Sequence, residues 1–421
     1  MLATMCLALG LAGCRGPIAG ASGPANPSAT GAGKTLAIVG ARIYTSPADA
    51  PIADGTVVIA DDRIGAVGRR DQVRVPGTAK VLDGTGLTVT AGFWNAHVHF
   101  TEAKWEPAAS RSTDELVSGL RAMLTRWGVV SVVDTGSALE NTLALRRRID
   151  SGEIPGPRIL LASGGFVPVG GSPYYLLPAK LMELPDAARA GTYVDRLLEY
   201  PGVDAVKLFT GSFATRQSII VMPVDVVRAA VEAAHRHGKQ VFSHPSNSAG
   251  ARAALDGGVD VLAHTFPSGP DWDRSLPRQM REANMALIPT LKLWPWELGR
   301  ANVPPAVLER VQANAGEQVR AFADLGGELI FGTDVGYMTD YDPADEYVLL
   351  QRAGLGFGAI LAMLTTAPVR RFGAEAGAGR VAGGSPADLA VLEGDPAAEI
   401  RNLARVRYTI RRGQVIYERA Q

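Results

Sequence analysis

The stretch Gly92–Phe100, which reads GFWNAHVHF, carries two histidines inside an apolar run. Successive side chains along a β-strand point to opposite faces, so His97 and His99 would share one face. Two imidazoles that point the same way from the end of a buried strand are suited to bind a metal ion, although either histidine alone is compatible with ordinary packing. Whether the pair belongs to a site depends on what the rest of the chain places beside it.

Apolar runs of strand length recur after this stretch, and helical segments separate several of them. Residues Pro223–Gly238, for example, have the apolar spacing of a helix and end at a glycine, a common helix stop. Together with residues 94–100, the strand-like runs are 128–136, 157–165, 203–211, 239–246, 259–266, 285–291 and 328–336. Eight strand–helix units predict an α/β fold, a (β/α)8 TIM barrel over residues 91–374, with a doubly wound open sheet as the alternative.

Both ends of the chain differ from this central part, because they contain short β-rich runs punctuated by glycine and aspartate. The N-terminal runs lie within residues 36–90, and the C-terminal runs begin near Ala387. Neither part is long enough to form a convincing domain alone. We therefore expect residues 34–90 and 375–421 to combine into one small composite β-sandwich domain.

The first 14 residues, MLATMCLALGLAGC, contain both cysteines of the chain. They resemble a bacterial lipoprotein signal with Leu11–Cys14 as its lipobox, although no lysine or arginine precedes Arg15, where a signal peptide normally has a basic start. We expect residues 1–13 to be a removable signal peptide, the Cys14 thiol to carry a lipid, and residues 14–33 to be a flexible tether. The expected location is extracytoplasmic, as a periplasmic lipoprotein held to the membrane only through Cys14. A disordered apolar tail is the alternative.

The charge balance excludes one broad class of partner. Lys plus Arg and Asp plus Glu both number 42, so the chain lacks the basic excess of a nucleic-acid-binding protein. The expected partner is a small-molecule substrate. Assembly into a homo-oligomer is left open.

Active sites of TIM barrels are built at the carboxyl ends of the strands, so polar residues at those positions are the candidates for chemistry. Four of the six histidines lie there. The candidates in chain order are His97, His99, Lys207, His244, His264 and Asp334. Lys207 stands out, because an unpaired ammonium group in so apolar a run would be costly to bury. His235 and His237 are interpreted as structural, since cations are favoured in the last turn of a helix.

These motifs resemble the amidohydrolase superfamily, the metal hydrolases that include dihydroorotase, phosphotriesterase and imidazolonepropionase. The resemblance rests on the His-x-His strand, the later histidines and aspartate, the β-rich chain ends, and the segment GSPADLAVLEGDP at Gly384–Pro396. It is strongest to the imidazolonepropionase-like and Xaa-Pro dipeptidase-like members. The superfamily often reads Pro-Gly-x-x-Asp-x-His-x-His, whereas this chain has Ala91 for the proline and Asn95 for the aspartate. Asn95 keeps a hydrogen-bonding group but loses the charge.

The resemblance implies a site for two divalent metal ions, zinc by default for such ligands. His97, His99 and Asp334 would hold one ion, His244 and His264 the other, and Lys207, carboxylated to N6-carboxylysine, would bridge them. In such enzymes a bridging hydroxide is the nucleophile. Asp334 would act as the catalytic general base and then as the general acid.

The substrate is expected to contain an amide, cyclic amide or dipeptide-type C–N bond. Tyr175, Trp294 and Tyr337 lie in segments that follow strand-like runs and are predicted to line its pocket. Three alternatives stay open. They are a lactonase or phosphotriesterase on the same metal site, a mononuclear imidazolone hydrolase or deaminase, and a lipoprotein without activity on an inherited barrel.

Overall fold

The computed structural model describes residues 35–266 and 272–420. The predicted signal peptide (1–13), the lipid on Cys14 and the tether (14–33) lie outside the described residues and stay predictions. No helix within the described ranges combines the length and the apolar character that crossing a bilayer requires.

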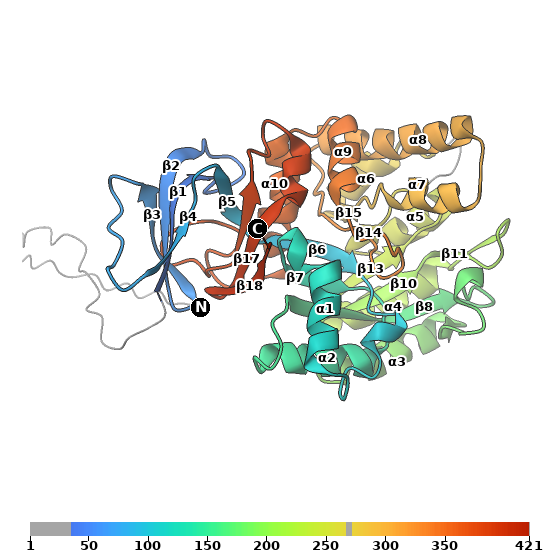
Figure 1. The fold of residues 1–421 in the computed structure, drawn as a ribbon. Helices are drawn as coiled ribbons and strands as arrows, with labels where there is room; N and C mark the ends of the chain where they lie inside the picture. Colours follow the sequence, from blue (N-terminus) through green and yellow to red (C-terminus); the bar gives the residue numbers. More distant parts are fainter. Residues whose placement is uncertain (1–34, 267–271, 421) are drawn as a thin grey trace, which may run out of the picture. The chain divides into compact units, whose positions relative to one another are not determined.

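The central part of the chain is a parallel barrel, as predicted (Figure 1). Its hydrogen-bonded strands follow one another around the sheet in chain order. They are β6 (Phe93–Val98), β7 (Val129–Asp134), β8 (Arg158–Pro168), β10 (Ala205–Phe209), β13 (Gln240–His244), β14 (Val261–Ala263) and β15 (Ala286–Ile288). Apolar side chains that are nearly inaccessible fill the barrel, among them Ala96, Val133, Phe242 and Ile288. This layered apolar filling is what makes a TIM barrel a packed core with a site only at its end.

The eighth predicted strand, residues 328–336, takes the eighth position without forming a regular strand. Ile330 N donates to Leu287 O at 3.0 Å on one side, and Ala96 N donates to Phe331 O at 2.8 Å on the other. The segment thus closes the ring between β15 and β6. Its ladder is interrupted at Asp334, whose left-handed backbone conformation (φ 68°) lies outside the β region.

Helices follow most of the strands and cover the barrel. They are α1 (Thr113–Met123), α2 (Leu139–Asp150), α3 (Ala187–Leu198), α4 (Val224–Arg236), α5 (Ser248–Asp256), α6 (Leu276–Glu282), α7 (Leu293–Arg300), α8 (Pro305–Asp324), α9 (Ala344–Arg352), α10 (Phe357–Leu364) and α11 (Thr366–Phe372). Local sequence explains several ends: Ser112 and Asn247 cap α1 and α5 by accepting from the backbone N–H groups of Glu115 and Gly250. Gly238, the predicted stop of α4, has a φ of 67°.

Two short elements extend the carboxyl ends of the barrel strands. The hairpin of β11 (Gly211–Phe213) and β12 (Ile219–Val221) follows β10, and β9 (Glu183–Leu184) pairs with the end of β8. Neither was predicted from the sequence.

The two chain ends combine, as predicted, and their strands form a single sheet. Its strands are β1 (Thr35–Ile43), β2 (Ile52–Ala60), β3 (Arg63–Arg69), β4 (Lys80–Asp83), β5 (Leu87–Ala91), β16 (Leu389–Glu393), β17 (Val406–Arg411) and β18 (Gln414–Glu418). The N- and C-terminal parts meet where β16 runs antiparallel to β5, with Leu389 opposite Ala91. A bridge between Arg63 and Pro386 brings β3 back to the start of β16, so the sheet curls around its own apolar core.

The sheet and the barrel meet at Gly92, the first residue of the histidine stretch. Gly92 N donates to Asp388 O at 2.8 Å, and a Cβ at this position would lie 2.6 Å from Val130 Cγ2. Only glycine fits this contact without a shift of its neighbours. β5 therefore passes directly into β6, and the His-x-His pair lies at the far end of that strand.

Candidate metal centre

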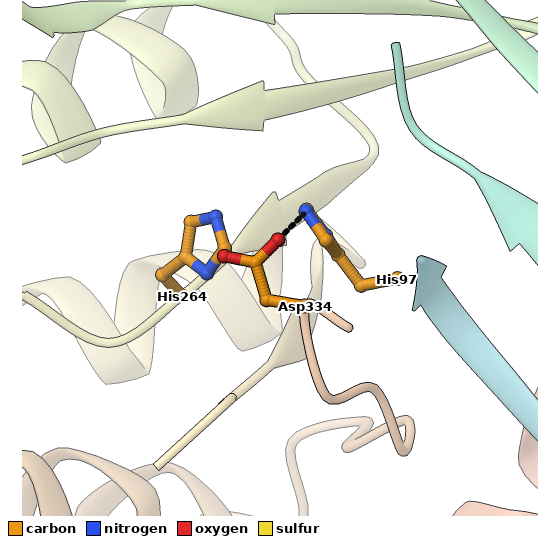
Figure 2. A group of neighbouring side chains, drawn as sticks. All are labelled: His97, His264 and Asp334. Carbon is orange, nitrogen blue, oxygen red and sulfur yellow. Dashed lines mark ion pairs between the residues drawn. The ribbon is translucent and has the colours of Figure 1, made fainter. Parts of the chain in front are cut away.

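Three of the candidate side chains converge at the carboxyl end of the barrel (Figure 2). His97 comes from β6, His264 follows β14, and Asp334 lies in the segment that closes the barrel. One ligand atom from each of the three residues lies within 4.8 Å of the other two. All three are buried, so the group forms a compact set of two imidazoles and one carboxylate that can hold a metal ion.

The other three candidates surround this group. His99 Nε2 lies 2.9 Å from Asp334 Oδ1, whereas His97 Nε2 lies 3.4 Å from the same oxygen. The ring centre of His244 lies 4.7 Å from that of His264. Lys207 Nζ is 5.5 Å from the ring centre of Phe209, the residue that β-sheet register pairs with His244. All six candidates line one cavity of about 290 Å3.

Burial controls the protonation of these groups. Burial is the main reason that the pKa values of His97 and His264 lie far below the ordinary value for histidine. Burial also lowers the pKa of His244 to about 3. The positive charge of Lys207 lowers the pKa of all three histidines further. The imidazoles are therefore neutral at physiological pH, and the neutral form is the one that ligates metal ions. Burial also lowers the pKa of Lys207 to about 8, which gives the neutral amine a substantial share near that pH.

The donor set fits a divalent cation. His97 Nδ1 and Asp334 Oδ1 are buried and have no hydrogen-bond partner of good geometry among the described residues. Neutral imidazoles and a carboxylate present lone pairs to one another here, and a cation between them would satisfy these pairs. His264 Nδ1 lies 2.7 Å from Thr290 Oγ1, a contact that orients the ring and leaves Nε2 available.

The backbone is strained at two of these ligands and at a residue that contacts one of them. His264 has a φ of 76° and Asp334 a φ of 68°, in the left-handed region that residues other than glycine seldom adopt. Thr290, the partner of the His264 ring, has a φ of 45°. Such strain persists where the surrounding structure holds a side chain in a required position, which is typical of functional sites.

Asn95 links the histidine strand to the aspartate segment. Its Nδ2 donates to Thr333 Oγ1 at 2.7 Å, and its Oδ1 accepts from Thr333 N at 3.1 Å and His97 N at 3.3 Å. The amide thus holds the residue before Asp334 against the backbone of His97. An aspartate could accept the same two N–H bonds, so the departure from the superfamily motif keeps this link.

Replacing Asn95 by alanine is expected to weaken metal binding about 10- to 100-fold, the usual effect of removing a group that orients metal ligands. The variant should also lose about 1–3 kcal/mol of unfolding free energy, because buried N–H groups lose their acceptor. Metal titration and chemical denaturation measure the two effects. Asn95→Asp is the control, and its metal affinity is expected to lie within a few fold of that of the parent protein. If Asn95→Ala bound metal as tightly as the parent protein, Asn95 would not be needed to orient the ligands.

Asp134 supports the backbone beside His99, and it was not predicted from the sequence. It ends β7, is fully buried, and accepts from Ser137 Oγ at 2.6 Å and from Thr142 Oγ1 at 2.8 Å. Ser137 Oγ in turn accepts from Phe100 N at 2.7 Å, next to His99. The strand-end rule that selected the other candidates would have selected Asp134 as well.

The residues predicted to contact substrate lie in the same cavity. Tyr175, Trp294 and Tyr337 all line it, and the Tyr175 and Tyr337 rings are 5.4 Å apart. Tyr337 Oη donates to Glu297 Oε1 at 2.6 Å, and burial raises the pKa of both tyrosines above the ordinary value. Glu297 was not predicted from the sequence. The cavity thus presents apolar rings and protonated phenols beside the candidate metal centre.

Comparisons with known proteins agree with this arrangement. The model of the amidohydrolase family matches residues 88–416. A putative prolidase from Bifidobacterium longum has a similar structure, with a TM-score of 0.75, 28% identity, and 91% of this chain and 95% of that chain covered. A Xaa-Pro dipeptidase with bound methionine in its active site has a TM-score of 0.77 at 20% identity, covering 91% of this chain and 100% of that chain.

A curated relative matches over a shorter segment. The enamidase of Eubacterium barkeri is 28% identical over 97 residues, which is 23% of this chain and 24% of the enamidase. The chain therefore aligns with about a quarter of the length of that relative.

Proposed function

Because this chain belongs to the amidohydrolase family and is a hydrolytic enzyme acting on C–N bonds, we propose that it cleaves an amide, cyclic amide or dipeptide-type bond with two divalent metal ions. The observation that carries this proposal is the meeting of four histidines, Asp334 and Lys207 in one cavity at the carboxyl end of the barrel. The dipeptidase and prolidase among the similar structures support a substrate of this class.

In this proposal His97, His99 and Asp334 would hold one ion, and His244 and His264 would hold the other. Lys207 would serve both ions as the carbamate, because the residue is 2% exposed and its amine makes no hydrogen bond or ion pair with a described residue. Carboxylation joins the nitrogen of the neutral amine to carbon dioxide and releases one proton. Counted from the ammonium form two protons are lost, so a cation becomes an anion with two oxygens. Bound there, divalent ions would supply a Lewis acid for the scissile carbonyl and lower the pKa of the attacking water.

Asp334 moves the proton in this mechanism. Its carboxylate accepts a proton from the attacking water and delivers it to the leaving nitrogen. One group placed between the water and the nitrogen is enough for both transfers. The left-handed backbone at Asp334 aims the carboxylate at the histidines, and Asn95 holds the preceding residue, Thr333, in place. The aromatic side chains of the cavity exclude bulk water from the reacting bond.

Metal removal tests this proposal. Dialysis of the enzyme against a chelator should lower its hydrolytic rate at least about 1,000-fold, since the Lewis acid and the activated water are lost together. Zinc added with bicarbonate should restore the rate. The rate is to be measured across N-acyl amino acids, dipeptides, cyclic imides, imidazolones, lactones and phosphotriesters.

The result that supports the proposal is metal-dependent hydrolysis that is fastest on one of the amide-type compounds. Fastest hydrolysis of a lactone or phosphotriester would assign the site to the alternative chemistry. A rate that survives chelation, with circular dichroism showing the fold unchanged, would contradict metal-dependent catalysis.

A further inference from the structure

One cation in the cavity lies apart from the candidate metal centre. Of the lysines and arginines within the described ranges, only Lys207 and Arg216 line the cavity, and Arg216 lies in the turn of the hairpin that follows β10. Arg216 makes no hydrogen bond or ion pair with a described residue. Its guanidinium carbon lies 5.5 Å from the ring centre of Tyr174, a contact that steadies the plane of the group without satisfying its N–H donors.

The hairpin that carries Arg216 is anchored at its base, and hydrogen bonds within its turn close the tip. At the base, Ser212 Oγ donates to Gly171 O in the loop after β8, and Ser246 Oγ donates to Gly211 O at 2.8 Å from the loop after His244. At the tip, Thr215 Oγ1 accepts from the backbone N–H groups of residues 217 and 218 at 3.2 and 3.0 Å. The position of Arg216 relative to the site is therefore set by two neighbouring loops of the barrel.

Gly211 shows how closely the base of the hairpin is packed. A Cβ on Gly211 would lie 2.0 Å from Pro245 O, and Pro245 directly follows His244. The hairpin and the histidine loop are thus in backbone contact, which ties the place of Arg216 to that of a proposed metal ligand.

The wall between Arg216 and the metal centre is aromatic and apolar. Tyr174 contacts Tyr175 with ring centres 5.5 Å apart, and Tyr175 contacts Tyr337 at 5.4 Å. The other side chains of this wall include Leu176, Leu181, Phe213 and Leu293. Two carboxylates of the cavity lie near this row. Glu297 is already bound by Tyr337 Oη, and Asp334 belongs to the candidate metal centre, so neither is available as a partner for Arg216.

We propose that Arg216 binds a free carboxylate of the substrate, and that the substrate is an amide with one carboxylate and a large apolar group packed on the tyrosine row. A guanidinium presents paired N–H donors in a plane that matches a carboxylate, and with no second cation beside it the site suits a group with a single negative charge. This inference rests on the proposed function, because it names the substrate class of that same cavity. Arg216 acts on specificity and takes no part in the chemical step.

The test uses two compounds that differ only in the carboxylate: N-benzoyl-L-leucine and N-(3-methylbutyl)benzamide. Each is bound to the zinc-loaded enzyme in a calorimeter, and each is also assayed for hydrolysis. The parent enzyme is compared with Arg216→Met, which keeps length but loses charge, and Arg216→Lys, which keeps charge but loses the planar fork. Arg126→Met is the matched control, because Arg126 also stacks on an aromatic ring, that of Trp127, but does not line the cavity.

We expect the parent enzyme to bind the carboxylate compound about 10- to 100-fold more tightly than its partner, the range for hydrogen bonds between charged groups. Arg216→Met should remove this preference and raise KM for the carboxylate compound while kcat changes little, and Arg216→Lys should keep part of it. Arg126→Met should behave as the parent does. No preference in the parent enzyme, or a preference that survives Arg216→Met, would overturn the assignment. Failure of the proposed function is a separate result, namely binding with this preference but no metal-dependent hydrolysis of any amide in the panel.

Discussion

Replacing Asp334 by asparagine is expected to lower kcat by about 100- to 10,000-fold, the range for loss of a general acid–base group. Asparagine has nearly the same shape as aspartate, so it keeps the left-handed backbone position at this site. It cannot accept the proton of the attacking water, however, nor offer an anionic oxygen to a cation. The variant should fold as the parent does, and kcat on the best compound of the panel measures the effect.

Asp134→Asn is the matched control for this prediction. Asp134 is also a buried aspartate at a strand end, but two hydroxyl donors, from Ser137 and Thr142, engage its oxygens. We expect its amide variant to lose mainly stability, about 1–3 kcal/mol from mismatched buried hydrogen bonds. If Asp334→Asn retained the parent kcat, the assignment of Asp334 as proton carrier would be wrong.

Replacing Lys207 by methionine is expected to abolish activity, with at least a 1,000-fold fall in rate, and not to destabilise the metal-free protein. The activity falls because no carbamate can form to bridge the two groups of ligands. Stability holds or rises because the uncompensated amine, 2% exposed, is replaced by an apolar side chain of similar length. Activity assays and the thermal midpoint of the metal-free protein measure the two effects.

Lys292 provides the contrasting variant. It is also buried, but its Nζ lies 2.8 Å from Asp340 Oδ2 and donates to the backbone oxygen of Asp342. Lys292→Met should therefore lose about 1.5–3 kcal/mol of stability, since a charged donor is removed from its acceptors. Equal loss of stability in the two methionine variants would indicate that Lys207 has a structural ion partner, and would remove the argument for its carboxylation.

Much of the fold follows from local pattern. Seven of the eight predicted strand runs contain a regular barrel strand, because short apolar runs separated by helices can bury both faces only in a parallel sheet. The combination of the two chain ends into one β-rich domain was predicted for a related reason, since neither end was long enough to form a convincing domain alone. The eighth run differs because the backbone of Asp334 has a left-handed conformation, which the spacing of apolar residues does not predict.

The part of the candidate site that lies at the carboxyl ends of the strands could be predicted from the sequence. The placement of His97, His244 and His264 follows from the parallel order of the strands, which brings their carboxyl ends to one edge. Arg216 and Glu297 could not be placed in this way. They lie on a hairpin and a helix whose positions depend on contacts such as Ser212 with Gly171 and Tyr337 with Glu297, and these join residues distant in sequence.

The central claim, a site for two metal ions bridged by carboxylated Lys207, is tested most directly by the metal content of the enzyme loaded with zinc in the presence of bicarbonate. Elemental analysis should give two zinc ions per chain in the parent enzyme and at most one in Lys207→Met. Crystals of the loaded enzyme should show anomalous scattering from two sites, with density for the carbamate between them. One zinc per chain in the parent enzyme, with an unmodified Lys207 side chain, would contradict the claim.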